Sequence, residues 1–543
     1  MRFKLNGLIE SCVHGCLPYC ARTRAELSSA GPGSREGTMG ETSDTVESRK
    51  DVVLATDILI DRRLALGAIA GAITSAQGLG LATAFGAAAN NLAEQFADYA
   101  AGIEYSAFDE KTIEVAKSLF IDAIGCAIAA HEEKPVRAVR EVALSAPGGV
   151  STVVGTARRT TPDLAAFANS AAIRYYDFND LYLGREPGHP SDLSGGCLAV
   201  AEAEGRSGKD LLLAIVLAYE INCRLLDAAE LTRRGFDHPI ASLPAGALAA
   251  GKLMRLPVEQ LTQAVNLAIN GHIALNQTRK QELSDWKGLA DPDAVRNAVF
   301  AALLARHGIT GPSPIFEGTA GLFKQVTGPF EIDFNQFGGR SGRFRIHHCS
   351  VKFYPAQGMT LTAIAAAERV GKEIGDFGKI AAIEIATTNF AYISAGKEPE
   401  KWAPETRETA DHSLPYIVAR ALVDGDITHD SFLASAVRDP KIRDLMKKIT
   451  VRPDEALSAM APKNLPNRVT ATLTDGRTIS HQVDAIPGFA SMPMQKSDFE
   501  LKFSKNVAKY MGKQQQRQVL DYLWSLERQE NLGRLFELLV VKA

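Results

Sequence analysis

Residues 207–226, SGKDLLLAIVLAYEINCRLL, contain the clearest fold signal in the sequence. Ser207 and Asp210 have the spacing of a capping box, in which two side chains close the first turn of a helix. The run 211–226 that follows is mostly apolar, and a long apolar run behind a helix cap predicts a helix rather than a strand. The sequence therefore indicates a helical fold at this point of the chain.

Similar helix signals occur on both sides of this stretch. Thr161-Pro162 has a cap residue followed by proline at the first helical position, and Asp291-Pro292 opens another helix that Gly308 closes. One apolar stripe has three- and four-residue steps: Ile113, Ala116, Phe120, Ala123 and Ala127. We therefore expect a mainly α fold whose first domain, residues 94–340, is a large all-helical domain.

The pattern changes after residue 340. Arg343, Arg345 and His347 alternate with apolar residues, which is the period of a strand, and 380–387 also has strand character. Two β-branched runs flank Asp475-Gly476, a favoured hairpin turn, while 360–371 and 414–423 have helical character. Residues 341–494 are thus expected to form a smaller α/β lid domain. The chain returns to helix in 495–543, which we expect to pack back onto the helical domain and make it discontinuous.

The first 93 residues read as an N-terminal extension. Residues 28–50 are polar and are expected to be disordered. Arg62 and Arg63 precede an uncharged apolar run, 64–93, so that 62–89 resembles a signal for export through the Tat pathway. A membrane-spanning helix and an apolar helix docked on the body are the alternatives that the same run allows.

Composition excludes several classes of protein. The 543 residues carry a formal net charge of -3, without the basic excess of a nucleic-acid-binding protein. The seven cysteines are sparse and odd in number, which is typical of reduced thiols, and Cys12, Cys16 and Cys20 lack a second cluster that would complete a metal site. Phosphate-binding glycine loops, HExxH and GxSxG are absent from the sequence. We expect no metal and no cofactor.

Four polar clusters lie between the helical segments. They contain Asp177 with His189; His238; Lys287 beside Trp286; and Arg343, Arg345, His347 and Lys352. Each has an ordinary structural explanation as a turn, a helix cap, a surface lysine or a charged edge strand. Taken together, basic groups and histidines without a cofactor motif fit a substrate that carries several carboxylates.

At these clusters the sequence resembles the MmgE/PrpD family of 2-methylcitrate dehydratases and cis-aconitate decarboxylases. The resemblance covers residues 94–540. It rests on six stretches in order: YDFND (176–180), HPS (189–191), FDHP (236–239), WKG (286–288), KFYPA (352–356) and HSLPY (412–416), the last followed by ALVDG (421–425). Each stretch alone is weak, whereas six in the family's order are specific.

The resemblance implies a helical domain with an α/β lid, a homodimer without cofactor, and a cytoplasmic location. It also implies a cleft lined by the catalytic candidates Asp177, His189, His238, Lys287, Lys352 and Tyr416. We add Arg343, Arg345 and His347 as substrate-binding candidates because fixed cations stabilise carbanion charge that develops beside carboxylates. His189 or His238 is expected to act as base or acid, with Asp177 orienting the histidine or sharing the proton. Neither nucleic acid nor a stable membrane contact is expected.

One departure from the family leaves the reaction open. Dehydratase-like and decarboxylase-like members carry a histidine shortly after the lysine motif, but here Lys352 leads into FYPAQGM (353–359). The leading hypothesis is a 2-methylcitrate dehydratase-like hydro-lyase. The alternatives are a decarboxylase or epimerase acting on a related di- or tricarboxylate, and a catalytically silent carboxylate-binding protein.

Overall fold

The computed structural model describes residues 91–541, which belong to one compact unit spanning Gly86–Ala543. Of the predicted N-terminal extension, residues 1–90, with Arg62, Arg63 and the run 64–89, lie outside the described residues, whereas Leu92 and Ala93 already belong to the first helix of the body. Among the described residues, no helix is both long and apolar enough to cross a membrane.

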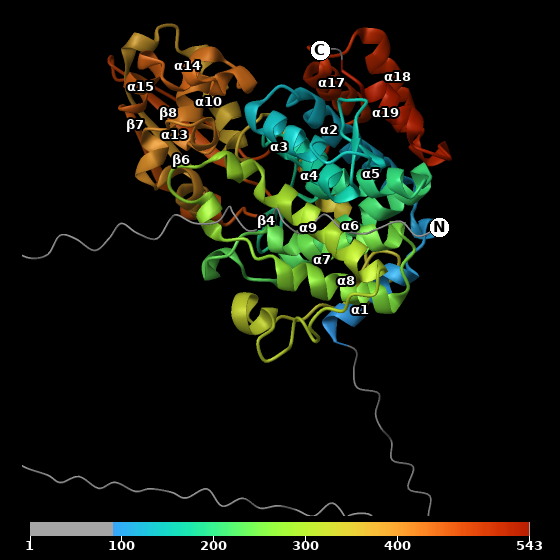
Figure 1. Cartoon of the computed structure of the whole chain (residues 1–543). Helices are drawn as coiled ribbons and strands as arrows, with labels where there is room; N and C mark the ends of the chain where they lie inside the picture. The colour runs from blue at the N-terminus through green and yellow to red at the C-terminus, as the bar shows by residue number, and fades with distance from the viewer. Residues whose placement is uncertain (1–90, 542–543) are drawn as a thin grey trace, which may run out of the picture. The chain divides into compact units, whose positions relative to one another are not determined.

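The first part of the described chain is mainly helical, as predicted (Figure 1). Its helices are α1 Leu92–Gly102, α2 Glu110–Ala129, α3 Lys134–Leu144, α4 Pro162–Arg174, α5 Leu193–Ala203, α6 Gly208–Ala228, α7 Pro239–Leu253, α8 Val258–Gly271 and α9 Ala290–Arg306. The capping box of Ser207 and Asp210 opens α6, and Gly308 adopts a positive φ just beyond α9. Local caps therefore define these helix ends, as the sequence predicted.

The expectation that this part is all-helical is wrong in detail, because short strands interrupt it. They are β1 Ser151–Thr152, β2 Arg159–Thr160, β3 Asp180–Leu183 and β4 Pro187–Gly188, while β5 Ser350–Val351 follows in the segment expected to contain strands. β1 pairs with β2, while β3 lies between β4 and β5. The β4-β3-β5 sheet holds residues that flank Asp177, His189 and Lys352, and it thereby brings these three chain segments together.

The predicted strand over residues 343–347 is also wrong. Residues Arg345–His348 form the 3₁₀ helix η8. The buried carboxylate of Glu220 accepts hydrogen bonds from the backbone N–H of Arg345 (2.6 Å) and of Gly338 (3.0 Å). Because this carboxylate takes the donor that a neighbouring strand would need, the alternating pattern of residues 343–347 does not produce a strand.

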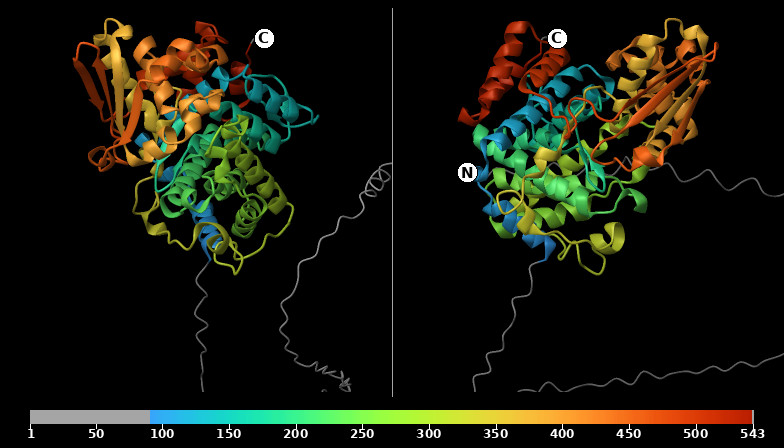
Figure 2. Two further views of the ribbon diagram at one scale, coloured as in Figure 1. Left: turned by 90° about the vertical axis from the view of Figure 1, so that its left-hand side faces the viewer. Right: turned by 180° about the vertical axis from the view of Figure 1, so that it is seen from behind.

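The later segment forms a smaller α/β body, drawn in orange in Figures 1 and 2. Its four-stranded sheet has the order β7 (Ile449–Pro453), β6 (Ile380–Thr387), β8 (Asn467–Leu473) and β9 (Thr478–Val483), in which β6 and β7 are parallel and the other pairs are antiparallel. The predicted hairpin around Asp475-Gly476 is present as β8 and β9. The elements are α10 Leu361–Glu373, β6 Ile380–Thr387, α11 Asn389–Ala391, α12 Arg407–Ala410, α13 Leu414–Asp424, α14 Ala434–Val437, α15 Pro440–Met446, β7 Ile449–Pro453, α16 Glu455–Ser458, β8 Asn467–Leu473 and β9 Thr478–Val483.

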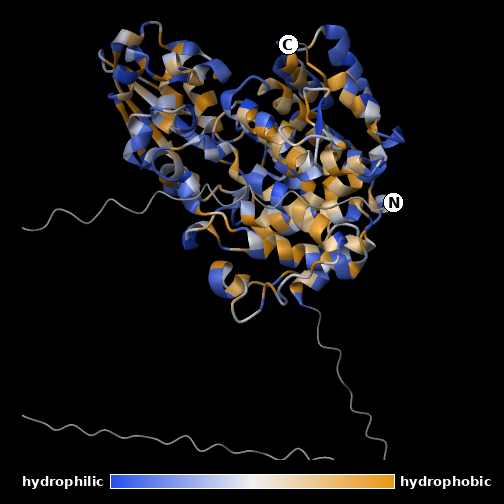
Figure 3. Ribbon diagram, viewed as in Figure 1, coloured by the Kyte–Doolittle hydropathy of each residue, from blue (hydrophilic) through white to orange (hydrophobic). Residues whose placement is uncertain are grey.

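Buried apolar residues form two large clusters. The first core runs from Leu92 to Val351 and resumes from Phe499 to Val541, whereas the second core lies between Tyr354 and Phe489. In Figure 3 the apolar residues of the first core gather on the central helices. The chain thus leaves the first core at Lys352 and returns to it after residue 489.

The C-terminal segment forms three helices, α17 Lys496–Val507, α18 Lys513–Trp524 and α19 Gly533–Leu539, that contribute to the first core. Phe503 of α17 is buried and lies against Gly125 of α2. Lys502 forms a buried ion pair with Asp122 (2.6 Å) and donates a hydrogen bond to the carbonyl of Phe178 (2.7 Å). The end of the chain therefore supports the loop that carries Asp177.

Candidate functional site

The carboxylate of Asp177 lies at the centre of a buried group of charges. Arg174 pairs with its Oδ1, which is also 2.7 Å from Lys352 Nζ, and Lys287 Nζ is 3.7 Å from its Oδ2. All four side chains are at most 2 % exposed. Burial alone would raise the pKa of Asp177, but Arg174, Lys287 and Lys352 outweigh it and hold the pKa well below its ordinary value. The carboxylate is therefore ionised.

The local backbone explains how Asp177 reaches this position. Helix α4 ends at Arg174, and the N–H of Asp177 donates to the Arg174 carbonyl at 3.0 Å. Asp177 has a φ of 52°, in the left-handed region that aspartate tolerates better than most residues. This turn places the carboxylate beside the guanidinium three residues earlier. Strained backbone of this kind is common at functional sites.

Lys287 and Lys352 reach the group from different segments. Lys287 lies in the 3₁₀ helix η5 (Asp285–Gly288), directly before α9, and Lys352 follows β5. Lys352 also donates to the backbone carbonyl of Asp177 at 2.8 Å. Burial lowers the pKa of Lys352 to about 8, although Asp177 partly offsets this effect. Trp286, which the sequence places beside Lys287, is 45 % exposed.

His189 directs an unprotonated nitrogen toward Asp177. Its Nδ1 is 2.7 Å from the backbone carbonyl of Asp180, which can only accept a hydrogen bond, so Nδ1 carries the proton. Its Nε2 therefore keeps a lone pair and lies 3.8 Å from Asp177 Oδ1. Burial, with the charges of Arg174 and Lys352, holds the pKa of His189 well below its ordinary value. The ring is neutral.

His238 is close to His189 but differs from it chemically. The two ring centroids are 5.7 Å apart. His238 Nδ1 lies 3.0 Å from Asp237 Oδ1, and its Nε2 faces Asp291 Oδ2 at 3.3 Å. Burial lowers its pKa, but the two carboxylates outweigh this and raise the pKa above its ordinary value. With both nitrogens beside carboxylates, His238 is suited to be a fixed cation rather than a group that exchanges protons.

The structure adds residues that sequence reasoning missed. Asp411 and His412, from the segment of the second core, meet Lys287 and Asp177. Lys287 Nζ is 3.0 Å from Asp411 Oδ2, and His412 Nδ1 is 2.5 Å from Asp411 Oδ1. His412 Nε2 lies 3.8 Å from Asp177 Oδ2. The stretch HSLPY carries part of this signal in the sequence, whereas Arg174, the last residue of α4, belongs to no motif that would single it out.

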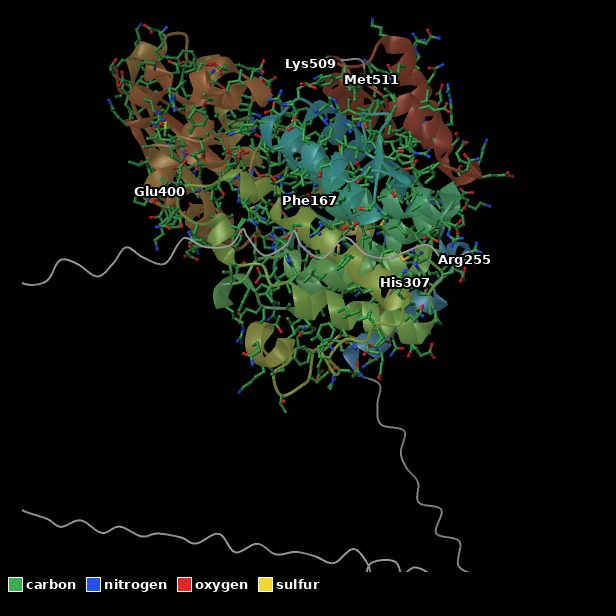
Figure 4. All side chains as sticks on the ribbon, viewed as in Figure 1. Phe167, Arg255, His307, Glu400, Lys509 and Met511 are labelled. Atoms are coloured by element: carbon green, nitrogen blue, oxygen red, sulfur yellow. The ribbon has the colours of Figure 1, made fainter. Side chains whose placement is uncertain are left out.

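Solvent reaches this group through its histidines. The side chains of His189, His238 and His412 are 10 %, 11 % and 14 % exposed, whereas the lysines and aspartates behind them are almost fully buried. The helical part contributes Asp177, His189 and Lys287. The smaller α/β body, on which Glu400 is labelled in Figure 4, contributes Asp411 and His412. The group therefore lies where segments from the two cores meet.

Tyr416 lies apart from this group. It is fully buried in the second core, and its hydroxyl donates to the backbone carbonyl of Ser431 at 2.5 Å. Its residue position, four after His412, puts it inside helix α13, whereas Asp411 and His412 precede that helix. The structure therefore gives Tyr416 a packing contact in the second core.

The three substrate-binding candidates also lie elsewhere. Arg343 and Arg345 line a separate pocket of about 350 Å³ together with Arg224 and Asp227, and Arg345 Nε is 3.1 Å from Asp227 Oδ2. His347 Nε2 lies 2.9 Å from the hydroxyl of Thr112. The 3₁₀ helix that replaces the predicted strand directs Arg345 and His347 to partners other than Asp177.

The chemistry of the donors argues against a metal at the centre. Ligand atoms of Asp177, Asp411 and His412 lie within 4.8 Å of one another, a spacing that a metal ion can bridge. However, the ammonium of Lys287 stands between the two carboxylates, and Lys352 and Arg174 approach Asp177 from further directions. Three cations already neutralise the carboxylates that a metal ion would need.

The cysteines of the described residues, Cys126, Cys197, Cys223 and Cys349, are free thiols, as predicted.

Comparison with known proteins gives a consistent result. The model of the MmgE/PrpD N-terminal domain matches residues 94–335, and that of the MmgE/PrpD C-terminal domain matches residues 354–527. The mitochondrial 2-methylcitrate dehydratase of Yarrowia lipolytica is 28 % identical over 416 residues, 72 % of this chain and 78 % of that protein. The 2-methylcitrate dehydratase of Escherichia coli strain K12 is 28 % identical over 461 residues (79 % and 92 %). The alkylcitrate dehydratase phiI of a fungal species, strain ATCC 74256, is 29 % identical over 440 residues (74 % and 85 %).

Proposed function

This chain belongs to the MmgE/PrpD family, and we propose that it is a cofactor-independent hydro-lyase that removes water from a small hydroxy-tricarboxylate of the 2-methylcitrate type. The observation that carries the proposal is the Asp177 carboxylate, which contacts Arg174, Lys287 and Lys352 while two neutral imidazoles face it. Relatives that are 2-methylcitrate and alkylcitrate dehydratases support the substrate class.

The charge balance of the group suits an anionic substrate. Arg174, Lys287 and Lys352 are three cations, whereas Asp177 and Asp411 are two ionised carboxylates whose pKa values are lowered despite burial. The three cations exceed the two carboxylates by one positive charge, which a carboxylate of the substrate can balance. In a buried setting each such contact is stronger than on the surface, because the effective dielectric constant is well below that of water.

Elimination of water requires a base and an acid. A neutral imidazole takes the proton from a carbon next to a carboxylate, and the C–H electron pair becomes the new C=C bond as the C–O bond breaks. The departing hydroxide takes a proton from Lys352, whose pKa of about 8 makes its ammonium a usable acid near neutrality. Lys352 uses two N–H groups on Asp177 and has a third for the hydroxyl.

One observation favours a second candidate function. His189 Nε2 and His412 Nε2 face different oxygens of Asp177, each at 3.8 Å. Two imidazoles around one position suit an epimerase, in which one neutral ring removes a proton from carbon and the other ring, after taking a proton from water, delivers that proton to the opposite face. The two functions differ in product, because epimerisation forms neither water nor a C=C bond.

A turnover panel tests the proposal. The purified full-length chain, with and without EDTA, is mixed with 2-methylcitrate, citrate or cis-aconitate. The expected result is a new C=C bond formed from a hydroxy acid of the panel, 2-methylcitrate or citrate, seen by ultraviolet absorbance, at a rate that EDTA does not change. Release of CO₂ from cis-aconitate or inversion of a stereocentre would overturn the hydro-lyase in favour of a decarboxylase or an epimerase. A ligand-induced rise in Tm without any product would indicate a silent carboxylate-binding protein.

The assembly and location that family resemblance implies complete the proposal. We infer a homodimer acting in the cytoplasm, with export through the Tat pathway as the alternative that Arg62 and Arg63 suggest. Sedimentation of the purified chain tests the first, and fractionation of cells that express it tests the second.

A further inference from the structure

Asp411 and His412 form a carboxylate–imidazole pair beside Asp177. The imidazole Nδ1 of His412 is 2.5 Å from Asp411 Oδ1, and its Nε2 lies 3.8 Å from Asp177 Oδ2. Asp411 is 1 % exposed and His412 14 %. The imidazole ring is therefore the more accessible member of the pair.

The protonation state of the ring follows from its partner. Lys287 and His412 hold the pKa of Asp411 below its ordinary value although burial opposes them, so the carboxylate is ionised and can only accept hydrogen bonds. Nδ1 of His412 must then carry the proton, and Nε2 keeps a lone pair. Burial and Lys287 lower the pKa of His412 to about 4, which keeps the ring neutral at pH 7.

Two neutral imidazoles face Asp177, and their supports differ. Nδ1 of His189 bonds an uncharged backbone carbonyl, whereas Nδ1 of His412 bonds a carboxylate that Lys287 holds at 3.0 Å. When an imidazole accepts a proton it becomes a cation, and an adjacent carboxylate stabilises that cation much more than a carbonyl does. Asp411 therefore supports His412 in the step that generates charge.

We propose that His412 is the base that removes the proton from the substrate carbon, and that Asp411 is a positioning residue that fixes its tautomer. This rests on the proposed hydro-lyase function. The C–H electron pair forms the C=C bond, Nε2 of His412 takes the proton, and the hydroxide leaves with a proton from Lys352. His412 then releases its proton to water, and Lys352 takes one from water, so that the net products are the alkene and water.

The first test measures the protonation state of His412 by NMR in the wild-type chain without substrate. Histidines are labelled with ¹⁵N, and the signal of His412 is identified by its loss in His412→Gln. The expected spectrum shows a neutral ring at pH 7 with the proton on Nδ1, and a change of tautomer in Asp411→Asn. A proton on Nε2, or a cationic ring at pH 7, would overturn the proposal.

The second test uses 2-methylcitrate and its form deuterated at the carbon that loses the proton. His412→Gln is expected to lower kcat by about 100-fold or more, with KM little changed and a larger deuterium isotope effect, because proton removal becomes the slow step. Asp411→Asn should lower kcat less, also with little change in KM. A rise in KM alone, with an unchanged isotope effect, would make His412 a binding residue and refute its role as the base.

A matched control exists on the surface of the other body. His481 of β9 lies 2.5 Å from Glu373, so that it too is a histidine paired with a carboxylate, but it is far more accessible. His481→Gln should leave kcat and KM unchanged. If wild-type protein turns over no acid of the panel, the proposed function fails, whereas the tautomer measured by NMR still reports on the Asp411–His412 pair by itself.

Discussion

Lys287 and Asp411, 124 residues apart in sequence, form a buried ion pair in which Nζ lies 3.0 and 3.1 Å from the two carboxylate oxygens. Lys287 belongs to the helical part and Asp411 to the segment of the second core. Neighbouring contacts reinforce this junction, because the N–H of Leu283 donates to the hydroxyl of Thr409 at 2.9 Å. The pair links the two bodies and at the same time orients groups that face Asp177.

Replacing Lys287 by alanine should impair both turnover and stability. Loss of the ammonium removes a contact to the anionic substrate, so kcat/KM should fall at least about tenfold, or about 1.4 kcal/mol. It also leaves the buried carboxylate of Asp411 without its cationic partner, since the His412 ring that remains is neutral, and this lowers Tm. Lys287→Arg should not restore full activity, because a planar fork replaces a compact charge. The exposed Lys397→Ala serves as control in steady-state kinetics, and equal activity of Lys287→Ala and wild type would refute the assignment.

The pH profile of kcat/KM should reflect the pKa of Lys352. Its pKa is lowered to about 8, so the ammonium that we propose as the acid is present at pH 7 and is lost as the pH rises through 8. His412, with a pKa of about 4, stays neutral over the same range. Activity should therefore be level from about pH 5 to 7 and fall above pH 8. An alkaline limb near the ordinary lysine pKa of about 10.4 would contradict this role.

Asp177→Asn should destabilise the fold strongly. Three buried cations lose their shared counter-charge, and breaking a buried pair costs about 3–5 kcal/mol. Since the pKa of Asp177 is depressed in the folded state, its stabilising effect is complete at pH 7 and is lost only as the pH falls through that low pKa.

Denaturant unfolding at pH 7 measures this effect. The control is Asp444→Asn, which removes one partner of the exposed pair with Lys447 and should change the free energy of unfolding by less than about 1 kcal/mol. A loss no greater than that of the control would mean that Asp177 is not the counter-charge of this group.

Arg343→Ala should leave kcat/KM within about threefold of wild type, as expected for a charge outside the active group. Arg343 is exposed and lines the separate 350 Å³ pocket with Arg345 rather than the group around Asp177. Steady-state kinetics on the acid that is turned over checks this. A tenfold loss would return Arg343 to the substrate-binding residues that the sequence suggested.

Several elements of the fold could be predicted because their signals are local. Ser207 and Asp210 close the first turn of α6 on their own, and Asp475-Gly476 turns the β8–β9 hairpin within a few residues. The strand predicted at 343–347 failed for the opposite reason. A distant residue, Glu220, accepts a hydrogen bond from the backbone N–H of Arg345, and the alternating pattern of side chains gives no indication of this contact.

The candidate site divides in the same way. Histidines and lysines in polar loops made Asp177, His189, Lys287 and Lys352 visible in the sequence, and the structure brings these four together. Tyr416 shares its stretch with His412 but lies inside α13, where helical geometry directs it to Ser431. Residue spacing could not separate the two, because they face different sides of the segment.

The sequence by itself determined the helices, the hairpin and the chemical types available for a site, since capping, turn formation and apolar periodicity act over a few residues. The tertiary structure alone decided that Arg174, Asp411 and His412 join Asp177 while Arg343 and Arg345 do not. Lys352 meets Asp177 across 175 residues and Lys287 meets Asp411 across 124. Such meetings depend on how two separate hydrophobic cores pack against each other, and that packing fixes the charges, the tautomers and the pKa values from which the proposed chemistry follows.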